Sequence, residues 1–513
     1  MEPITKASRT EWIGLAVLAL PTLLVSMDAT VTYLAIPTIS AILKPSASEL
    51  LWITDIYIFL EGGLLITMGT LGDRIGRKKL LIYGAVAFAI ASAFAAFANS
   101  AHMLIAARGL MGIAGATLLP STVSLIRSMF HDDRQRAVAI GIWTTCFSTG
   151  TMLGPLLGGL LLHYFWWGSV FLISVPVMLL FLVMGPLFLR EYRSPGHEKF
   201  DLVSAFQLLA GILAIIYSIK RIGERLVAEP ITISLLVAGA VILYFFIKRQ
   251  RRITNPLIDL NLFLLAPFSA TLLALLCSLF CWSGVYLFVA QYLQLVLMFD
   301  AQKAGLWTVP AAALGMISCL SAPLIARFAG RNTVIITGMI LIMMGLIMLS
   351  QVPDNAGLFL LVFATILLTA GCSLAVTLGV DKVISSVPAS RAGVAAGIYE
   401  TSTTFGSALG IAVLGSIGTA IYRNSLHSEQ AGNTLGQAST LSASLPANQA
   451  KDLFQLAQTS FNYAFAIIAL FAVVMLFIVI LVVGSVYRSE RSISPNADSV
   501  SYTHLTLPTT ERV

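Results

Sequence analysis

The chain has 513 residues, of which 58% are hydrophobic and only 11% are charged, and its mean hydropathy is +0.89. A soluble protein of this length needs far more charge to cover its surface, so a soluble enzyme or binding domain is excluded. The net charge of +7 comes from basic residues spread over short polar breaks between apolar segments. We therefore expect no nucleic-acid partner, and a lipid bilayer as the surroundings.

Apolar runs of about 20 residues recur along the chain, which is the length that an α-helix needs to cross a bilayer. The pattern predicts an all-α membrane protein with fourteen transmembrane helices. The first span lacks a cleavage pattern and is predicted to be retained. The predicted spans are residues 12–36, 50–71, 79–99, 103–128, 135–162, 167–189, 200–222, 230–250, 265–291, 303–328, 332–351, 357–380, 391–421 and 460–486.

The basic residues indicate which way the chain crosses the membrane. If the N-terminus is cytoplasmic, the large majority of the 31 lysines and arginines fall on cytoplasmic segments. The few on the other side include Lys44, Lys220 and Lys303. By the positive-inside rule, both termini are predicted to be cytoplasmic.

Two polar segments interrupt or follow the apolar pattern. The longest break, 423–460, is rich in Ser, Ala, Gln and Asn and is predicted to be an external loop. The sequence is compatible both with a helical segment over 448–461 and with an irregular loop there. The end of the chain, 500–513, contains VSYTHLTLPTT, which resembles the translation of a sequencing-library adaptor. We expect this tail to be an artefact and exclude it from fold reasoning.

Acidic side chains lie inside the predicted spans. A carboxylate in hydrocarbon costs about 3 kcal/mol or more, so it persists there when it has a function. Asp28, Glu61 and Glu400 are such residues, and Glu61 lies at the middle of its span. Asp55 lies about 9 Å nearer the outer face and about 120° around the same helix, where a structural and a functional role are both open. Tyr57 shares a face with Glu61, four residues later.

The loop after the second span has an ordered pattern of glycine, acid and base. It reads Gly69-Thr-Leu-Gly-Asp73-Arg74-Ile-Gly76-Arg77-Lys78-Lys79. Glycine permits a tight turn between two helices, and an acid can accept from a helix N-terminus. The pattern resembles the signature loop of the major facilitator superfamily. A weaker copy without the acid follows at 324–331, which favours two repeated halves.

Span five carries glycines at intervals of four, namely Gly150, Gly154 and Gly158, with Pro155 and Gly159 beside them. Residues four apart lie on nearly one helix face, so a neighbouring helix can approach closely, and the proline can kink the helix. The run resembles the antiporter motif of drug:proton exporters in the same superfamily.

Arg108 lies a few residues inside span four, where a guanidinium needs a carboxylate or carbonyl partner. It resembles the superfamily's span-four arginine, which is implicated in proton transfer; a snorkelling arginine is the alternative. Asp28-Ala-Thr30, followed by an exit at Pro37, resembles the first span of the fourteen-span drug:proton antiporter branch. This resemblance covers the chain to about residue 490. Some relatives that handle divalent cations carry an acid where Gly315 stands.

The resemblance implies a major facilitator fold of two six-helix bundles with two inserted helices. The implied divisions are 1–190 for the first bundle, 191–262 for the inserted helices and 263–499 for the second bundle. It also implies a monomer in the bacterial inner membrane, without a cofactor and driven by the proton gradient.

The implied activity is proton-coupled export of lipophilic monocations and dications, such as quaternary ammonium compounds, methyl viologen, cationic dyes and biocides. The residues expected to couple protons to substrate are Asp28, Glu61, Glu400 and Arg108. The candidate residues of a substrate cavity are Asp55, Tyr57, Trp143 and Tyr399, whose rings can attract cations.

Two other functional classes are weighed against export. A proton-coupled carrier of one metabolite or nutrient would share the signature loop but lack the Gly-Pro-x-x-Gly-Gly run of span five. A membrane enzyme would need a nucleophile, a base or a metal site, and the sequence has no phosphate loop and no His-Glu-x-x-His pattern. The five cysteines have no metal-ligand spacing, so we expect no metal and no enzymatic activity.

Overall fold

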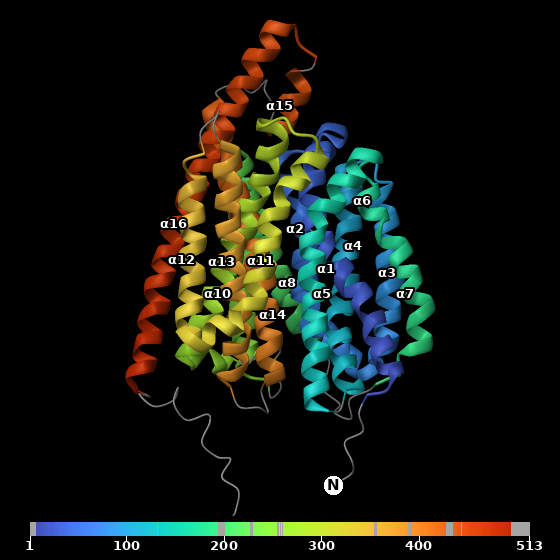
Figure 1. The fold of residues 1–513 in the computed structure, drawn as a ribbon. Helices are drawn as coiled ribbons and strands as arrows, with labels where there is room; N and C mark the ends of the chain where they lie inside the picture. Colours follow the sequence, from blue (N-terminus) through green and yellow to red (C-terminus); the bar gives the residue numbers. More distant parts are fainter. Residues whose placement is uncertain are drawn as a thin grey trace, which may run out of the picture.

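The computed structural model describes residues 7–130, 132–192, 201–225, 229–253, 256, 258, 260–352, 357–387, 392–426, 434–442 and 444–493, so the tail 500–513 lies outside the described residues. Within these ranges the chain is helical (Figure 1). The first half has α1 (Arg9–Leu43), α2 (Ala47–Ile75), α3 (Arg77–Ala96), α4 (Ala101–Met129), α5 (Asp133–Tyr164), α6 (Ser169–Leu172), α7 (Ser174–Phe188), α8 (Leu202–Arg225) and α9 (Pro230–Gln250). The second half has η1 (Leu260–Leu264), α10 (Ala266–Gln291), η2 (Tyr292–Val296), α11 (Ala301–Ala329), α12 (Arg331–Leu349), α13 (Gly357–Ser385), α14 (Ala392–Leu426), α15 (Leu435–Ser442) and α16 (Ala447–Ile493).

The helices are long and apolar, as the hydropathy pattern predicts. Among the described residues, 13 spans are long and apolar enough to cross a membrane. The 29-residue helix α2 occupies the second predicted position but is not among them. The count of fourteen transmembrane helices therefore stays a prediction.

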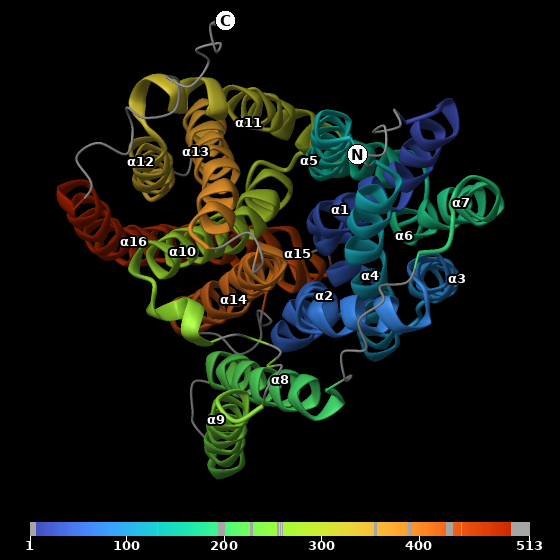
Figure 2. The ribbon, with the colours of Figure 1, turned by 90° about the horizontal axis from the view of Figure 1, so that it is seen from below.

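Two helical bundles stand side by side. Helices α1 to α7 form one bundle, and α10 to α14 form the other together with α16 (Figure 1). Seen from below, α8 and α9 lie outside both bundles (Figure 2). Helix α8 contacts α2 of the first bundle, α14 of the second and its neighbour α9. This layout is the one that the sequence predicts, while the divisions at residues 190 and 262 stay predictions.

Several helices begin where the sequence supplies a capping side chain. Ser46 precedes α2, and its hydroxyl accepts a hydrogen bond from the Glu49 backbone amide at 3.2 Å, while the Glu49 carboxylate accepts from the Ser46 amide at 2.7 Å. Asp132 and Asp300 cap α5 and α11 in a similar way, each accepting from a backbone amide at 2.8 Å. These side chains satisfy amides that a helix start leaves without partners, and so fix where each helix begins.

Asp201 caps the inserted helix α8 and joins it to α9. Its carboxylate accepts from the Ser204 amide at 3.0 Å and the Ser204 hydroxyl at 2.5 Å, and the Arg249 guanidinium of α9 donates to it at 3.0 Å. Partial burial raises the pKa of Asp201, but the hydrogen bonds from Ser204 and Arg249 outweigh it and hold this pKa below its ordinary value. The charged form therefore stabilises the start of α8.

We expect Asp201→Asn to lower the free energy of unfolding by about 0.5–1 kcal/mol at neutral pH, because asparagine caps a helix as well as aspartate but lacks the charge. A group whose folded pKa is depressed contributes stability that is full above its unfolded pKa, about 4, and is lost as the pH falls through the folded pKa. The difference in Tm between the parent and the variant, measured in detergent, should therefore shrink as the pH falls below about 4. A difference that is independent of pH would contradict the assignment.

The predicted external segment 423–460 is largely helical. Helix α14 extends to Leu426, α15 follows, and α16 starts at Ala447 and continues unbroken for 47 residues. The excursion predicted over 448–461 is therefore the first part of α16, and an irregular loop is wrong for these residues. The start of α16 rises above both bundles beside α15 (Figure 1). The Gln437 amide group of α15 donates to the Pro45 carbonyl at 2.5 Å, and that of Gln458 in α16 donates to the Leu295 carbonyl at 3.0 Å.

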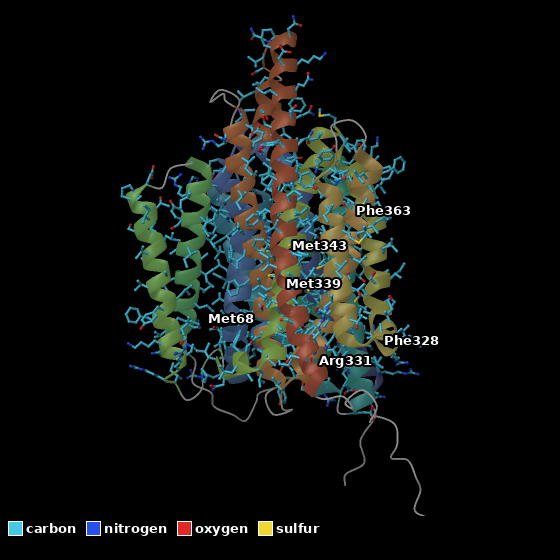
Figure 3. The ribbon with its side chains drawn as sticks, turned by 90° about the vertical axis from the view of Figure 1, so that its left-hand side faces the viewer. Met68, Phe328, Arg331, Met339, Met343 and Phe363 are labelled. Atoms are coloured by element: carbon cyan, nitrogen blue, oxygen red, sulfur yellow. The ribbon has the colours of Figure 1, made fainter. Side chains whose placement is uncertain are left out.

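The outside of the bundles is apolar. Phe328 and Phe363 stand at the periphery of the second bundle (Figure 3), and Phe328 is 92% exposed. Exposed large hydrophobic side chains also cover α7, α9, α11 and α16. An apolar outer surface of this extent is stable in lipid and not in water.

Candidate functional site

A buried ion pair joins α1 to α4. The Arg108 guanidinium donates from Nη1 to Oδ2 of Asp28, and each side chain is only 1% exposed. Arg108 also donates from Nε to the Ile53 carbonyl of α2 at 3.0 Å. The expectation that Arg108 needs a carboxylate or carbonyl partner is confirmed, because it has one of each. Three helices of the first bundle therefore meet at this guanidinium.

Aromatic rings surround the guanidinium. Its central carbon lies 4.4 Å from the centre of the Tyr57 ring and 5.6 Å from that of Phe171. Tyr57 is fully buried. Cation–π attraction stabilises a charge that is otherwise cut off from water. The structure thus places Tyr57 against Arg108 in the interior of the first bundle.

Glu61 lies one turn beyond Tyr57 on α2 and faces the same neighbour, α4. A Cβ atom added at Gly115 of α4 would lie 3.3 Å from the Glu61 Oε1 atom and 3.4 Å from the Tyr57 hydroxyl. The Tyr57 hydroxyl and the Glu61 carboxyl group interact with each other, but neither oxygen atom makes a hydrogen bond of good geometry within the described residues. Buried polar atoms without partners are rare in proteins and often mark where a proton or ligand binds.

Glu400 reaches the same region from the second bundle. The carboxyl group of Glu61 is within electrostatic range of both Asp28 and Glu400. The contact between the halves is close here, since a Cβ atom added at Gly62 would lie 2.5 Å from the Thr404 side chain, one turn after Glu400. Glu400 is half-buried, and Glu61 is only 7% exposed. Acidic groups from both halves thus converge where α2 meets α14.

Trp143 and Tyr399 contact mainly other groups, although Tyr399 precedes Glu400 directly in the chain. The Trp143 indole of α5 donates to the Thr122 hydroxyl at 3.1 Å and stacks on Phe147 at 6.1 Å between ring centres. Tyr399 packs against a small apolar cluster of η1, α10, α13 and α14 that includes Phe268. Both side chains are half-buried, and their predicted part in a substrate cavity stays a prediction.

Asp55 has a partner that the sequence pattern did not reveal. Its Oδ2 atom lies 2.7 Å from Nζ of Lys220 in α8, and both side chains are fully buried. The sequence placed Lys220 among the basic residues of the outer side; the structure shows it buried against Asp55, and its side of the membrane stays a prediction. The apolar length of α8 and the acid on α2 together hold the lysine inside the protein. Asp55 therefore faces α8, away from the α4 side that Tyr57 and Glu61 share.

The signature loop forms a tight turn, and the residues that follow α7 hydrogen-bond to it. Gly76 joins α2 to α3 with a φ of +111°, a conformation that favours glycine. The Lys78 amide at the start of α3 donates to Glu191 Oε1 at 3.0 Å, and the Arg77 amide donates to the Tyr192 carbonyl at 3.0 Å. Arg74 is exposed, while Gly69 is half-buried. The side chain of Asp73 lies outside the described residues.

The predicted close approach at span five is confirmed, and the neighbour is α1. Cβ atoms added at Gly150 and Gly154 would overlap atoms of α1, and one added at Gly158 would lie 2.8 Å from the Val31 side chain. The Thr30 hydroxyl of α1 also donates to the Thr151 carbonyl of α5 at 3.0 Å. The glycine face therefore packs on the part of α1 that carries Asp28.

The same end of α5 also meets the second bundle. A Cβ atom added at Gly159 would lie 2.6 Å from the Ala301 carbonyl oxygen of α11, and one at Gly305 would lie 2.6 Å from the Pro155 carbonyl oxygen. The Tyr33 hydroxyl of α1 lies 3.3 Å from that of Ser283 in α10. All these contacts lie toward the predicted outer ends of the helices. The two halves are thus joined on the predicted outer side of the acidic groups.

The N-terminal half of α5 is open by comparison. Thr145 and Ile142 are exposed, and a Cβ atom at Gly141 would meet no atom within 4 Å. In the described part of the chain, no group of three or more His, Cys, Asp or Glu side chains is arranged to hold a metal ion.

Comparison with known proteins agrees with this arrangement. The family model described as Major Facilitator Superfamily matches residues 18–411. The multidrug efflux pump LfrA of Mycolicibacterium smegmatis is 38% identical over 493 residues, which cover 94% of this chain and 98% of LfrA. The methyl viologen resistance protein SmvA of Salmonella typhimurium is 31% identical over 467 residues, which cover 89% of this chain and 94% of SmvA.

A solved structure shares the fold. It is the inward-facing, unoccupied form of a bacterial homologue of the human lysosomal transporter Spinster, with a TM-score of 0.66 at 17% identity. The match covers 94% of this chain and 98% of that chain.

Proposed function

We propose that this chain, which belongs to the major facilitator superfamily, exports lipophilic cations from the bacterial cytoplasm in exchange for protons. It is a multi-pass membrane transporter whose relatives are multidrug efflux and resistance proteins. The proposal adds the substrates, namely monocations and dications such as quaternary ammonium compounds, methyl viologen, dyes and biocides. It also adds the inner membrane, the proton gradient as the energy source and a monomer as the working unit.

The observation that carries this proposal is the meeting of acidic groups from both halves. Glu61 of α2 and Glu400 of α14 converge where the halves touch, and Asp28 lies within electrostatic range of Glu61. Arg108 already compensates Asp28. Of these three acids, Glu61 and Glu400 have no basic partner in the ion pairs of the described residues, so they supply negative charge for cations.

Competition between protons and cations couples the two fluxes. A carboxyl group in a cavity of low dielectric is neutral when it binds a proton, and a cationic drug then gains no charge partner there. When the proton leaves toward the cytoplasm, the carboxylate attracts the cation. Rocking of the halves about the meeting point exposes the group to either side in turn. The close contact of Gly159 in α5 with the start of α11 provides a surface between the halves on which such rocking can occur.

The relatives support the choice of export. LfrA is named as a multidrug efflux pump, and SmvA as a protein of methyl viologen resistance. The family match over residues 18–411 spans the segments that hold Asp28, Glu61 and Glu400. Methyl viologen is a dication, which suits two acids in one cavity.

A carrier for one metabolite or nutrient is the second candidate. It is tested by expression of the chain in a bacterial host that lacks its own efflux pumps. We expect raised tolerance to several unrelated lipophilic cations, together with accumulation of a cationic dye in everted vesicles whose lumen is acidic. Growth on one new nutrient without any change in tolerance would select the carrier instead.

We expect Glu61→Gln and Glu400→Gln each to lower export of a dicationic biocide roughly tenfold, because each removes one negative charge from the cavity. Export of a monocation should fall less. Glutamine keeps the size of the side chain, so the difference between the two substrates reports charge. Resistance is measured at matched expression levels. Unchanged resistance to dications in both variants would assign the two acids to helix packing.

A further inference from the structure

A second cluster of charged and aromatic groups lies between α2 and α8. The Lys220 ammonium is 2.7 Å from Oδ2 of Asp55 and 4.1 Å from the centre of the Trp52 ring. The side chains of Asp55 and Lys220 are fully buried, and Trp52 is half-buried. The Thr54 hydroxyl lies 3.4 Å from the other carboxylate oxygen of Asp55.

These groups have the chemistry of an ammonium site. A carboxylate supplies the opposite charge and accepts hydrogen bonds, and the face of a tryptophan attracts a cation electrostatically. Burial makes both interactions stronger and makes an unpaired charge costly. The site is built by one turn of α2, while the cation that occupies it comes from α8.

The position of α8 between the two halves makes the ion pair of Asp55 and Lys220 important for how the halves are joined. Helix α8 contacts α2 of the first bundle and α14 of the second. At Gly63 of α2, an added Cβ atom would overlap Leu209 of α8 and lie 3.7 Å from Phe405 of α14. The inserted helix therefore covers the line along which the two halves meet (Figure 2). Its buried ion pair is made with the first half.

We propose that Trp52 and Asp55 form an ammonium-binding site inside the membrane, and that Lys220 is its resident cation and fixes α8 to the first half of the transporter. Lys220 is thus a positioning residue. While the ammonium occupies the site, Asp55 is neutralised and does not serve as a carboxylate for protons or exported cations. The inserted helices then move with α2 when the halves rock, and α14 moves relative to them.

The test replaces Lys220 by a shorter side chain and then adds the removed part of the side chain as a free small molecule. Lys220→Ala removes three methylene carbons and the ammonium, which together correspond to propylammonium. Thermal unfolding is measured on the full chain in detergent, where no proton gradient exists for an amine to dissipate. We expect Lys220→Ala to lower Tm by several degrees, because it leaves Asp55 buried without its partner.

Propylammonium chloride should raise the Tm of Lys220→Ala toward that of the parent in a saturable manner, since a ligand that binds the folded state stabilises it. The same salt should not change the Tm of the parent or of the double variant Asp55→Asn with Lys220→Ala. 1-Propanol, which has the same carbon chain without the charge, should not raise the Tm of Lys220→Ala. An equal shift in the double variant, an equal effect of 1-propanol, or a parent-like Tm for Lys220→Ala would overturn the proposal.

If Lys220→Ala yields no folded protein, the double variant Asp55→Asn with Lys220→Met tests the proposal instead. It removes both charges and fills the space, so it should fold, because the defect of the single variant comes from an unpaired carboxylate. Failure of this neutral variant to fold would also overturn the proposal.

Discussion

Asp28→Asn is expected to lower proton-driven efflux of a cationic dye by about a hundredfold or more, the largest effect of any single substitution in this chain. The substitution removes the charge partner of Arg108 at a point where both side chains are 1% exposed. Breaking a buried pair from one side costs about 3–5 kcal/mol, and about 1.4 kcal/mol corresponds to a factor of ten. Export is measured as dye accumulation in everted vesicles whose lumen is made acidic.

A neutral pair separates coupling from packing. The variant Asp28→Asn with Arg108→Gln leaves no unpaired charge in the interior, so we expect it to fold as well as the parent. If Asp28 exchanges protons, this variant stays without proton-driven efflux although it is folded. If the pair only holds α1 to α4, the neutral variant regains transport. Undiminished efflux in Asp28→Asn itself would show that Asp28 does not couple protons to transport.

Gly150→Ala is the second substitution with a large expected effect. An added Cβ atom would overlap the Ser26 hydroxyl and, more seriously, the Leu23 carbonyl oxygen in the backbone of α1. The helix itself must then move, and overpacking of this kind costs about 1–3 kcal/mol. The displaced segment carries Asp28 one turn further on. We therefore expect a lower Tm in detergent and roughly a tenfold loss of efflux.

The same helix supplies the matched control. Gly141→Ala makes the same chemical change nine residues earlier, where an added Cβ atom would meet nothing within 4 Å. We expect its Tm and efflux to stay within the small range of surface substitutions, about 0.5 kcal/mol. If Gly141→Ala and Gly150→Ala were equally harmful, steric contact with α1 would not be the reason for the glycine at position 150.

The fold was predictable from the sequence because its signals are local. Hydropathy located the long helices, and the relatives confirm the family that the signature loop and the span-five glycines indicated. Helix ends were less accurate. The last helix begins at Ala447, well before the predicted start at residue 460, because its polar first turns stand outside the apolar layer.

The candidate site was predictable only in part. The cost of burying Arg108 demanded a partner, and Asp28 and a backbone carbonyl provide it. Lys220 could not be found in the same way, because a lysine near the end of an apolar segment usually reaches to the membrane surface. Its partner Asp55 comes from a helix distant in the sequence. Only the packing of α8 on α2 brings the two together.

The helical projection of α15 and α16 has a consequence for inhibition. Gln437 of α15 binds the Pro45 carbonyl between α1 and α2, although α15 belongs to the second half of the chain. With the predicted orientation, this clasp stands on the outer side of the inner membrane. An antibody fragment that holds α15 in place would therefore arrest the alternation of the halves. Such an inhibitor would not need to enter the cytoplasm, so it would escape expulsion by the transporter it blocks.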